Sequence, residues 1–173
     1  MVGAFVVLTG AAGSGKTTIA QTIEASHPEY TVFHFDSIGV PSEEIMDSFG
    51  PGYQPGGAWQ RAMTLQWLGR LAPTLTAGSS VLLEGQIRIA FIEEALKVAR
   101  ITNGRIILVE CDEQTRSARL IINRKQPELV NERTIGWGAF LHREAAKGGH
   151  EILDTSTMPL EDAVSRVANY LAV

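Results

Sequence analysis

Eight consecutive residues near the start of the chain combine glycines, a lysine and a threonine in a fixed order. The segment from Gly10 to Thr17 reads GAAGSGKT and fits the pattern GxxxxGK[ST] at every fixed position. Glycines allow backbone conformations in which successive N–H groups point at phosphate oxygens, and Lys16 supplies a compact positive charge to the same oxygens. The Thr17 hydroxyl can ligate Mg²⁺. This spacing predicts a site for a nucleoside triphosphate, with ATP and Mg²⁺ as the expected cofactors.

The sequence around this segment fits the same chemistry. An apolar run at 4–8 precedes it, and a helical pattern at 15–25 follows it. The amino terminus of a helix directs unpaired N–H groups and the positive end of its dipole at an anion. The predicted nucleotide-binding residues here are Gly10, Ala11, Ala12, Gly13, Ser14, Gly15, Lys16, Thr17 and Thr18.

Apolar, β-rich runs alternate with helical stretches along the rest of the chain. The predicted strands are 4–8, 31–35, 80–83, 105–109 and 150–153, and the predicted helices are 15–25, 58–75, 90–99, 113–123, 134–147 and 159–171. Three of the strands are continuously apolar, which suits a parallel sheet covered by helices on both faces. The alternation predicts one three-layer α/β/α domain over 1–173, with right-handed crossovers.

Composition limits the possible partners and surroundings. The 173 residues carry a formal net charge of −4, so no overall basic field would attract nucleic acid. The single cysteine, Cys111, cannot form an internal disulfide, which favours the cytoplasm. No apolar run approaches the ~20 residues that a membrane-spanning helix needs. We therefore expect a small-molecule partner and no membrane, and the oligomeric state stays open.

The loop and the element order together resemble the P-loop kinases that act on small molecules and nucleoside monophosphates. That branch includes shikimate kinase, gluconate kinase, chloramphenicol phosphotransferase and adenylate kinase. The resemblance covers nearly the whole chain in element order, but only short motifs match in residues. It implies a five-stranded parallel sheet in the order 2-3-1-4-5, a helical acceptor-binding segment at 36–75 and a short lid at 124–134. It also implies transfer of the γ-phosphate of ATP to a hydroxyl of a metabolite or antibiotic.

Asp36 follows the second predicted strand in the run His34-Phe35-Asp36-Ser37. In kinases of this branch that phosphorylate hydroxyls, an acidic residue at this place lies beside the acceptor hydroxyl. The resemblance therefore implies that Asp36 positions the acceptor or accepts its proton as the new P–O bond forms. An ordinary turn or helix-capping aspartate is the alternative.

Three further residues are candidates for the acceptor side. Glu84 and Arg88 follow the third strand, where the pattern resembles the acid, glycine and arginine of adenylate kinases. There the arginine binds the acceptor phosphate, and Glu84 is expected to order a water on Mg²⁺. Arg61 is the first arginine of the acceptor segment and is a candidate acceptor ligand. Adenylate kinases usually place an arginine earlier, so a hydroxyl-bearing metabolite is favoured over a nucleotide.

The run from Cys111 to Arg124 resembles the helix that enters the lid in these kinases. The resemblance implies that Arg119 stacks on adenine and that Arg124 neutralises the transferring phosphate, with Arg133 as a second catalytic arginine. Asp154 follows the last strand, where the family's loop lies along the adenine. Each arginine could instead be a solvated surface residue.

Other classes of P-loop protein fit less well. A GTPase should show DxxG after the third strand and NKxD after a later one, and Glu84-Gly85-Gln86-Ile87 and Asn123-Arg124-Lys125-Gln126 match neither. A nucleotide-sensing module without transfer activity is a rival from a different class. A polynucleotide kinase is a second rival, and the acidic net charge argues against it.

Overall fold

The computed structural model describes residues 2–50 and 57–172. Within them the strands are β1 Phe5–Thr9, β2 Thr31–His34, β3 Val81–Gly85, β4 Gly104–Glu110 and β5 Glu151–Asp154. The α-helices are α1 Lys16–Ser26, α2 Glu43–Asp47, α3 Gly57–Thr76, α4 Ile89–Val98, α5 Glu113–Ala118, α6 Glu132–Gly148 and α7 Leu160–Leu171. Each predicted strand and helix is therefore present, with bounds that shift by a few residues.

The five described strands form one parallel sheet in the order β2-β3-β1-β4-β5, which confirms the predicted topology. β1 lies at the centre and is buried along its whole length. Its side chains alternate between the two faces: Phe5 and Val7 belong to one hydrophobic cluster, and Val6 and Leu8 belong to the other. A strand with both faces covered needs apolar residues at every position, which explains the continuous apolar run in the sequence.

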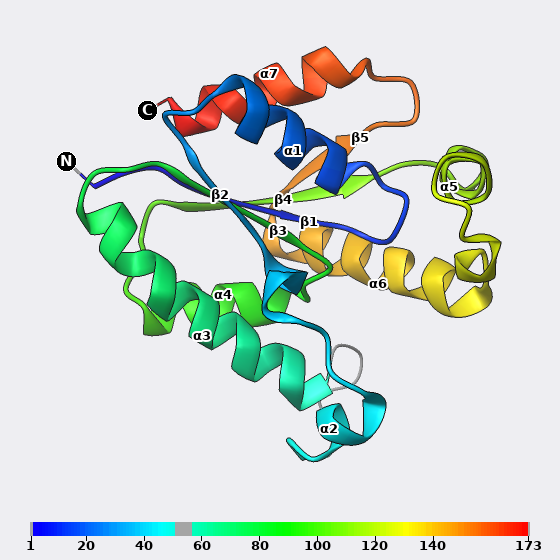
Figure 1. Ribbon diagram of the computed structural model, residues 1–173, viewed down its shortest axis with the longest axis horizontal. Helices are drawn as coiled ribbons and strands as arrows, with labels where there is room; N and C mark the ends of the chain where they lie inside the picture. Colours follow the sequence, from blue (N-terminus) through cyan, green and yellow to red (C-terminus); the bar gives the residue numbers. More distant parts are fainter. Residues whose placement is uncertain (1, 51–56, 173) are drawn as a thin grey trace.

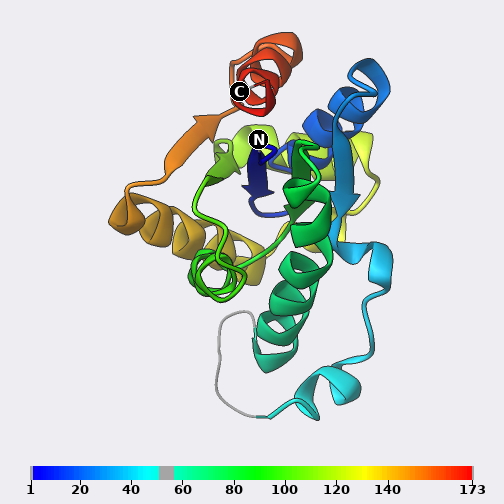
Figure 2. The same cartoon turned by 90° about the vertical axis from the view of Figure 1, so that its left-hand side faces the viewer.

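Helices cover both faces of the sheet, as Figures 1 and 2 show. The side chains of α1 and α7 pack on one face, through residues such as Ile19, Ile23 and Val167. The larger cluster on the other face joins α3, α4 and α6 through Leu71, Ile92 and other residues. Trp59 and Trp67 are buried in this larger cluster, so the aromatic side chains that α3 turns to the sheet belong to the core.

Two regions differ from the sequence-based expectation. The short helix α2 was not predicted, and its amino terminus is capped by Ser42, whose hydroxyl accepts a hydrogen bond from Ile45 N. The helix predicted at 113–123 divides into α5 and a π-helical turn, Arg119–Asn123. Pro127 stands in a 3₁₀ turn, Pro127–Leu129, that connects this turn to α6. The run at 49–57, rich in glycine and proline and therefore typical of a loop, lies mostly outside the described residues, because 51–56 are not described.

The carboxyl ends of the parallel strands meet at one edge of the sheet. In Figure 1 this edge faces the loop between β1 and α1, and α5 lies beside that loop. Both chain termini lie toward the opposite end of the strands (Figure 1). Because ligands of open α/β sheets bind outside the carboxyl ends of the strands, the functional side chains are expected here. None of the described helices combines the length and the apolarity needed to span a membrane.

Candidate active site

The loop from Gly10 to Gly15 has the backbone geometry that its glycines allow. Gly15 has φ +100° and stands as the residue before α1, a conformation that a side chain would strain. Gly10 passes so close to β4 that an added Cβ would lie 2.2 Å from the carbonyl oxygen of Val109. The loop is therefore pressed against the sheet at one end and turns sharply into α1 at the other.

The amino terminus of α1 fits an anion. Gly15 supplies no side-chain cap, and the first turn of α1 contains no acidic residue. The backbone N–H groups of that turn are therefore left for another acceptor. Ser14 is 2% exposed, and its Oγ has no hydrogen-bond partner in the described part of the chain. A buried hydroxyl and uncapped amides are the groups that a polyphosphate would satisfy, so these residues fit the predicted nucleotide.

Lys16 is a buried cation at the start of α1, with 5% of its surface exposed. Burial lowers the pKa of its ammonium, and the guanidinium of Arg124 lowers that pKa further. The carboxylates of Glu84 and Asp36 act in the opposite direction. The structure thus brings together Lys16, Asp36, Glu84 and Arg124, which come from four separate segments of the chain. A polyphosphate beside Lys16 would supply the negative charge that its burial demands.

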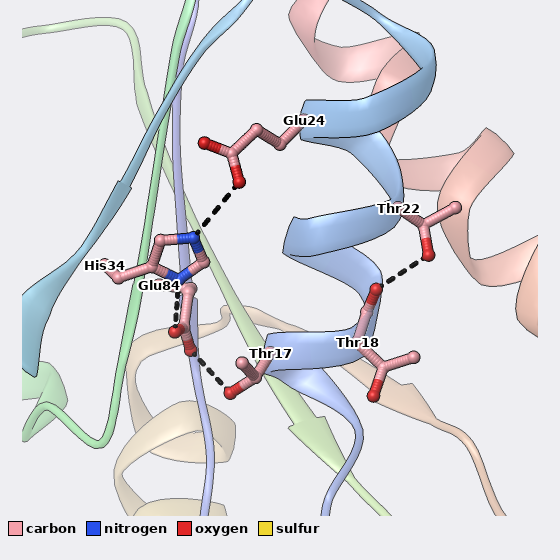
Figure 3. Close-up of polar contacts among 6 residues, drawn as sticks. All are labelled: Thr17, Thr18, Thr22, Glu24, His34 and Glu84. Carbon is pink, nitrogen blue, oxygen red and sulfur yellow. Dashed lines mark hydrogen bonds and ion pairs between the residues drawn. The ribbon is translucent and has the colours of Figure 1, made fainter.

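A chain of polar contacts links α1 to the ends of β2 and β3 (Figure 3). Thr17 Oγ1 donates a hydrogen bond to Glu84 Oε2 at 3.1 Å. The other oxygen of this carboxylate, Oε1, lies 2.8 Å from His34 Nδ1. His34 Nε2 lies 3.6 Å from Glu24 Oε2 on α1. Glu84 is 6% exposed, so this carboxylate is held on both oxygens in a buried position.

His34 is a functional candidate that sequence reasoning missed. Its signal was available, because His34 and Glu84 are the residues paired in register where β2 and β3 end. Parallel neighbours at the same level of a sheet place their side chains side by side. His34 lies against Glu84 Oε1 and would fix the orientation of that carboxylate if a metal ion bound beside Thr17.

Metal binding at this place would depend on few protein ligands. Among residues 2–50 and 57–172, no group of three or more His, Cys, Asp and Glu side chains is arranged to hold a metal ion. Mg²⁺ in phosphotransferases is commonly bound by one or two protein groups together with phosphate oxygens and water. The pair of Thr17 and Glu84 fits that kind of site, and it does not fit a site made of protein ligands alone.

Asp36 stands in a 3₁₀ turn, Phe35–Ile38, directly after β2. The residue is exposed, but neighbouring protein atoms desolvate its carboxylate and raise its pKa, and the charge of Glu84 raises that pKa further. Lys16 opposes this shift. The turn is anchored because Trp67 Nε1 on α3 donates to the carbonyl oxygen of Phe35 at 3.1 Å. A carboxylate of raised pKa beside a buried lysine has the properties of a proton acceptor.

Arg119 is held against the back of the glycine loop. Its Nη1 donates to two carbonyl oxygens of the loop, that of Gly13 at 3.4 Å and that of Ser14 at 3.2 Å. The guanidinium also binds Thr155, with Nη1 donating to Oγ1 at 2.9 Å and Nη2 donating to the carbonyl oxygen at 2.8 Å. The predicted stacking of Arg119 on adenine is not tested by these contacts. They give the residue a second role, because they connect the loop to the segment after β5.

Thr155 is a second residue that sequence reasoning missed. It is 5% exposed, and its Oγ1 lies 2.8 Å from Ser14 O and 3.1 Å from Glu110 O. Its backbone N–H also donates to Glu110 O at 2.8 Å. Because threonines after a strand are common, only the tertiary contact with the glycine loop distinguishes this one.

Four further residues were predicted to contact the nucleotide or its phosphates. Arg124 is exposed directly after the π-helical turn, and Arg133 is exposed in the first turn of α6. Asp154 ends β5, and its Oδ1 accepts hydrogen bonds from Ser156 N and Ser156 Oγ at 2.8 and 2.5 Å. Thr18 is exposed on α1, with its carbonyl oxygen bonded to Thr22 Oγ1 (Figure 3). Their predicted contacts with nucleotide stay predictions.

A cavity of ≈ 300 Å³ lies behind the glycine loop, bounded by the end of β4 and by α6. Ala11, Asp112, Arg116, Gly138 and Asp154 are among the residues that line it. Cys111 is half-buried in this wall, and its Sγ lies 3.6 Å from Gly13 O. Desolvation raises the pKa of the Cys111 thiol, so it stays protonated and unreactive at neutral pH.

The two arginines predicted to bind the acceptor are engaged with carboxylates. Arg61 on α3 contacts both oxygens of Glu94 on α4, with Nε donating to Oε2 at 2.7 Å. Arg88, the residue before α4, donates from Nε to Glu144 Oε1 at 2.9 Å. Both lie on the face of the sheet covered by α3, α4 and α6.

Comparison with solved structures identifies the fold. The chain is similar to a gluconokinase from Sinorhizobium meliloti, with a TM-score of 0.65 and 15% identity over 99% of this chain and 93% of the other. For a shikimate kinase from Acinetobacter baumannii in complex with shikimate, the TM-score is 0.58 and the sequence identity is 18%, over 98% of this chain and 93% of the other. For the Mycobacterium tuberculosis APS kinase in complex with AMPPNP and APS, the TM-score is 0.62 and the sequence identity is 15%, over 99% of both chains.

These matches confirm that the chain has the fold of P-loop kinases of small molecules and nucleotides, which the glycine loop and the element order predicted. No protein-family model and no curated protein sequence matches the chain. The identities are low, so the likeness describes the fold and leaves the reaction to be argued from the site.

Proposed function

We propose that this protein is an ATP-dependent phosphotransferase that moves the γ-phosphate of ATP to a hydroxyl group of a small molecule. The observation that carries the proposal is the convergence of Lys16, Glu84 and Asp36 at the carboxyl edge of the sheet, directly beside a glycine loop with uncapped amides. A nucleotide-binding loop alone would need no carboxylate of raised pKa at that place. In phosphoryl transfer to a hydroxyl, such a carboxylate orients the hydroxyl and receives its proton.

On the donor side, the amides of the glycine loop and of the first turn of α1 bind the phosphates, and Lys16 adds its charge to them. Bound Mg-ATP supplies the phosphoryl group together with a cation that neutralises part of its charge. Thr17 Oγ1 would be the ligand that this chain gives to the metal, and Glu84 would bind to it through water, with the position of the carboxylate fixed by His34.

On the acceptor side, Asp36 orients the hydroxyl and takes its proton. The burial that raises its pKa makes Asp36 a stronger base than an exposed aspartate, while Lys16 keeps it ionised enough to act. Arg124 already acts electrostatically on Lys16 and is suited to approach the transferring phosphoryl group from the lid. Arg133, in the first turn of α6, is suited to the same task once the lid closes.

The test measures ATP turnover by the purified protein with Mg²⁺ against a library of sugars, polyols, nucleosides, nucleotides and antibiotics. The Asp36→Ala variant should lose phosphoryl transfer and retain Mg-ATP binding, measured by calorimetry. Equally slow hydrolysis by both proteins, with no acceptor found, would instead support a nucleotide-sensing module. Absence of Mg-ATP binding by the wild-type protein would reject the proposal outright.

A further inference from the structure

We propose that the acceptor is a hydroxyl compound that carries no phosphate group, because Glu144 and Glu94 neutralise the two arginines that would otherwise bind one. This inference rests on the proposed phosphotransferase function and names the class of its substrate. It replaces the expectation that Arg88 binds an acceptor phosphate.

Arg88 and Glu144 form an ion pair that is largely removed from water. Their side chains are 23% and 17% exposed. Arg88 Nε donates to Glu144 Oε1 at 2.9 Å, and Glu144 Oε2 lies 3.4 Å from the backbone N of Ala90. The carboxylate is thus bound at both oxygens, which holds it beside the guanidinium. Removing it would leave an uncompensated, partly buried charge on Arg88.

The guanidinium of Arg88 is also fixed in direction. It lies between two aromatic rings, with its Cζ 5.2 Å from the centroid of Phe91 and 5.1 Å from that of Phe140. The backbone N of Arg88 donates to Gln60 Oε1 at 2.8 Å, and Gln60 Nε2 donates to Gln86 O at 2.9 Å. These contacts join α3, α6 and the segment after β3 around the arginine. Arg88 therefore connects the helices around it, and Glu144 already supplies the anion that its guanidinium binds.

Arg61 is engaged in the same way, one helical turn from the start of α3. It meets both oxygens of Glu94, the arrangement in which a guanidinium binds a carboxylate most firmly. A phosphate that took the same pair of donors would have to displace Glu94, and at any other donor it would meet a guanidinium whose charge Glu94 already balances. Farther along α3, Arg70 places its guanidinium over the ring of Trp67, 5.6 Å from the centroid.

The charged groups around Asp36 also disfavour an acceptor that carries a phosphate. Asp36 and Glu84 are carboxylates that act electrostatically on each other, and burial and Glu84 both raise the pKa of Asp36. Lys16 acts electrostatically on both carboxylates, and Arg124 acts on Lys16. The proposed function uses both of these cations for the donor phosphates. A second phosphate dianion would therefore meet carboxylates without a net positive partner. A neutral or cationic hydroxyl compound would meet hydrogen-bond acceptors, which its hydroxyls can satisfy.

The direct test titrates inorganic phosphate into protein whose donor site is saturated with Mg²⁺ and a non-hydrolysable ATP analogue. The proteins are the wild type, Glu144→Gln, and Glu94→Gln as the matched ion-pair variant. Glutamine keeps the size and the acceptor oxygen of the side chain but removes its charge. We expect no saturable phosphate binding by the wild type at millimolar concentrations. Glu144→Gln should acquire a phosphate site at least ~10-fold tighter, because it leaves Arg88 with net positive charge.

Two outcomes would overturn the inference. Millimolar or tighter phosphate binding by the wild type, abolished by Arg88→Ala, would mean that Arg88 accepts an anion despite Glu144. Absence of binding by both the wild type and folded Glu144→Gln, checked by circular dichroism, would mean that Glu144 does not control the charge of this site.

A turnover comparison separates this inference from the proposed function. Parent hydroxyl compounds are assayed beside their monophosphates, such as glucose with glucose 6-phosphate and adenosine with AMP. Higher kcat/KM for a monophosphate than for its parent would overturn the inference and leave the phosphotransferase function standing. Intact Mg-ATP binding with no transfer to any compound would reject the function, while the phosphate titration would still decide the charge of the site.

Discussion

The glycine loop at the start of α1 and the segment at the start of α3 both border the carboxylates of Asp36 and Glu84, but they hold positive charge differently. In the described ranges 2–50 and 57–172, neither Lys16 nor Arg119 forms an ion pair with a carboxylate. Arg119 is bound by neutral groups, the carbonyl oxygens of Gly13, Ser14 and Thr155 and the Thr155 hydroxyl.

On the acceptor side, each arginine near the start of α3 and α4 meets a carboxylate. Arg61 pairs with Glu94, and Arg88 pairs with Glu144. Backbone carbonyls position a guanidinium and leave its charge in place, whereas a carboxylate positions it and cancels that charge. Under the proposed function, the glycine-loop side therefore keeps positive charge for a polyanion, while the ion pairs on the side of α3 and α4 hold the helices together without leaving such charge.

The largest effect is expected from Lys16→Ala, which removes the buried cation of the donor side. We expect kcat/KM to fall by about 10³-fold or more, since one charge aimed at the transferring phosphates is lost. The folded state should not lose stability, because burial disfavours the charged form of Lys16 and lowers its pKa. Steady-state kinetics and thermal melting check both results, with the exposed Lys147→Ala as control. Unfolding of Lys16→Ala would show that the lysine is structural.

A second effect is the pH dependence set by Asp36. Because its pKa is raised in the folded protein, kcat/KM should fall about tenfold per pH unit below that pKa. The contribution of Asp36 to the free energy of unfolding has the opposite pH dependence to that of an aspartate with a lowered pKa. Folding favours its protonated form, so the protein is stabilised at low pH. This stabilisation is lost as pH rises through the pKa of the folded state.

Asp36→Asn should therefore lose the acid limb of the rate profile and gain stability relative to the wild type as pH rises toward 7. Asp47→Asn, on exposed α2, serves as the control. Measurements of kcat/KM and of urea unfolding across the pH range check the two parts separately. Equal stability changes for both variants would contradict the assigned shift.

A smaller effect is expected from Thr155→Val, which keeps the volume and removes the hydroxyl that joins Arg119, Ser14 and Glu110. Loss of a buried hydroxyl that makes these bonds should destabilise the protein by about 1–3 kcal/mol. We also expect about tenfold weaker ATP binding, since the loop loses a support on its outer side. Calorimetry and denaturant unfolding measure the two effects. The control Thr157→Val, at an exposed position, should change neither the stability nor the affinity for ATP. Weaker ATP binding by both variants would mean that the hydroxyl of Thr155 has no specific role in supporting the loop.

The smallest effect is expected from Glu94→Gln on the acceptor side. The Arg61–Glu94 pair is about one-third exposed at both side chains, so its loss should change the free energy of unfolding by less than about 1 kcal/mol. ATP binding should not change, because the pair lies on α3 and α4, away from the glycine loop. A clear loss of ATP affinity would break the division into donor and acceptor sides. Urea unfolding and calorimetry supply the measurements.

The sequence predicted the strand, glycine loop and helix at 4–26 for a local reason. The segment from Gly10 to Thr17 specifies its own loop conformation and its own chemistry over a few residues. The continuous apolar runs of β1, β3 and β4 likewise predicted a parallel sheet, because only a sheet covered on both faces requires them. The short helix α2 and the π-helical turn before Arg124 carried weaker local signals and were missed.

The tertiary contacts around the site were harder to predict because they join distant parts of the chain. Arg88 and Glu144 are 56 residues apart, and Arg119 and Thr155 are 36 apart. An arginine after a strand has the same identity whether it is paired or available, so the sequence could not tell whether Arg88 carries net charge. His34 and Glu84 meet only because β2 and β3 are neighbours in register.

Short-range spacing and hydrophobic pattern were therefore enough to predict the sheet, the glycine loop and the place of the candidate carboxylates along the chain. Which side chains keep a net charge at the site depends on tertiary packing. The charge of a side chain in a folded protein depends on what lies within a few ångströms of it, and those neighbours are set by how helices and strands pack.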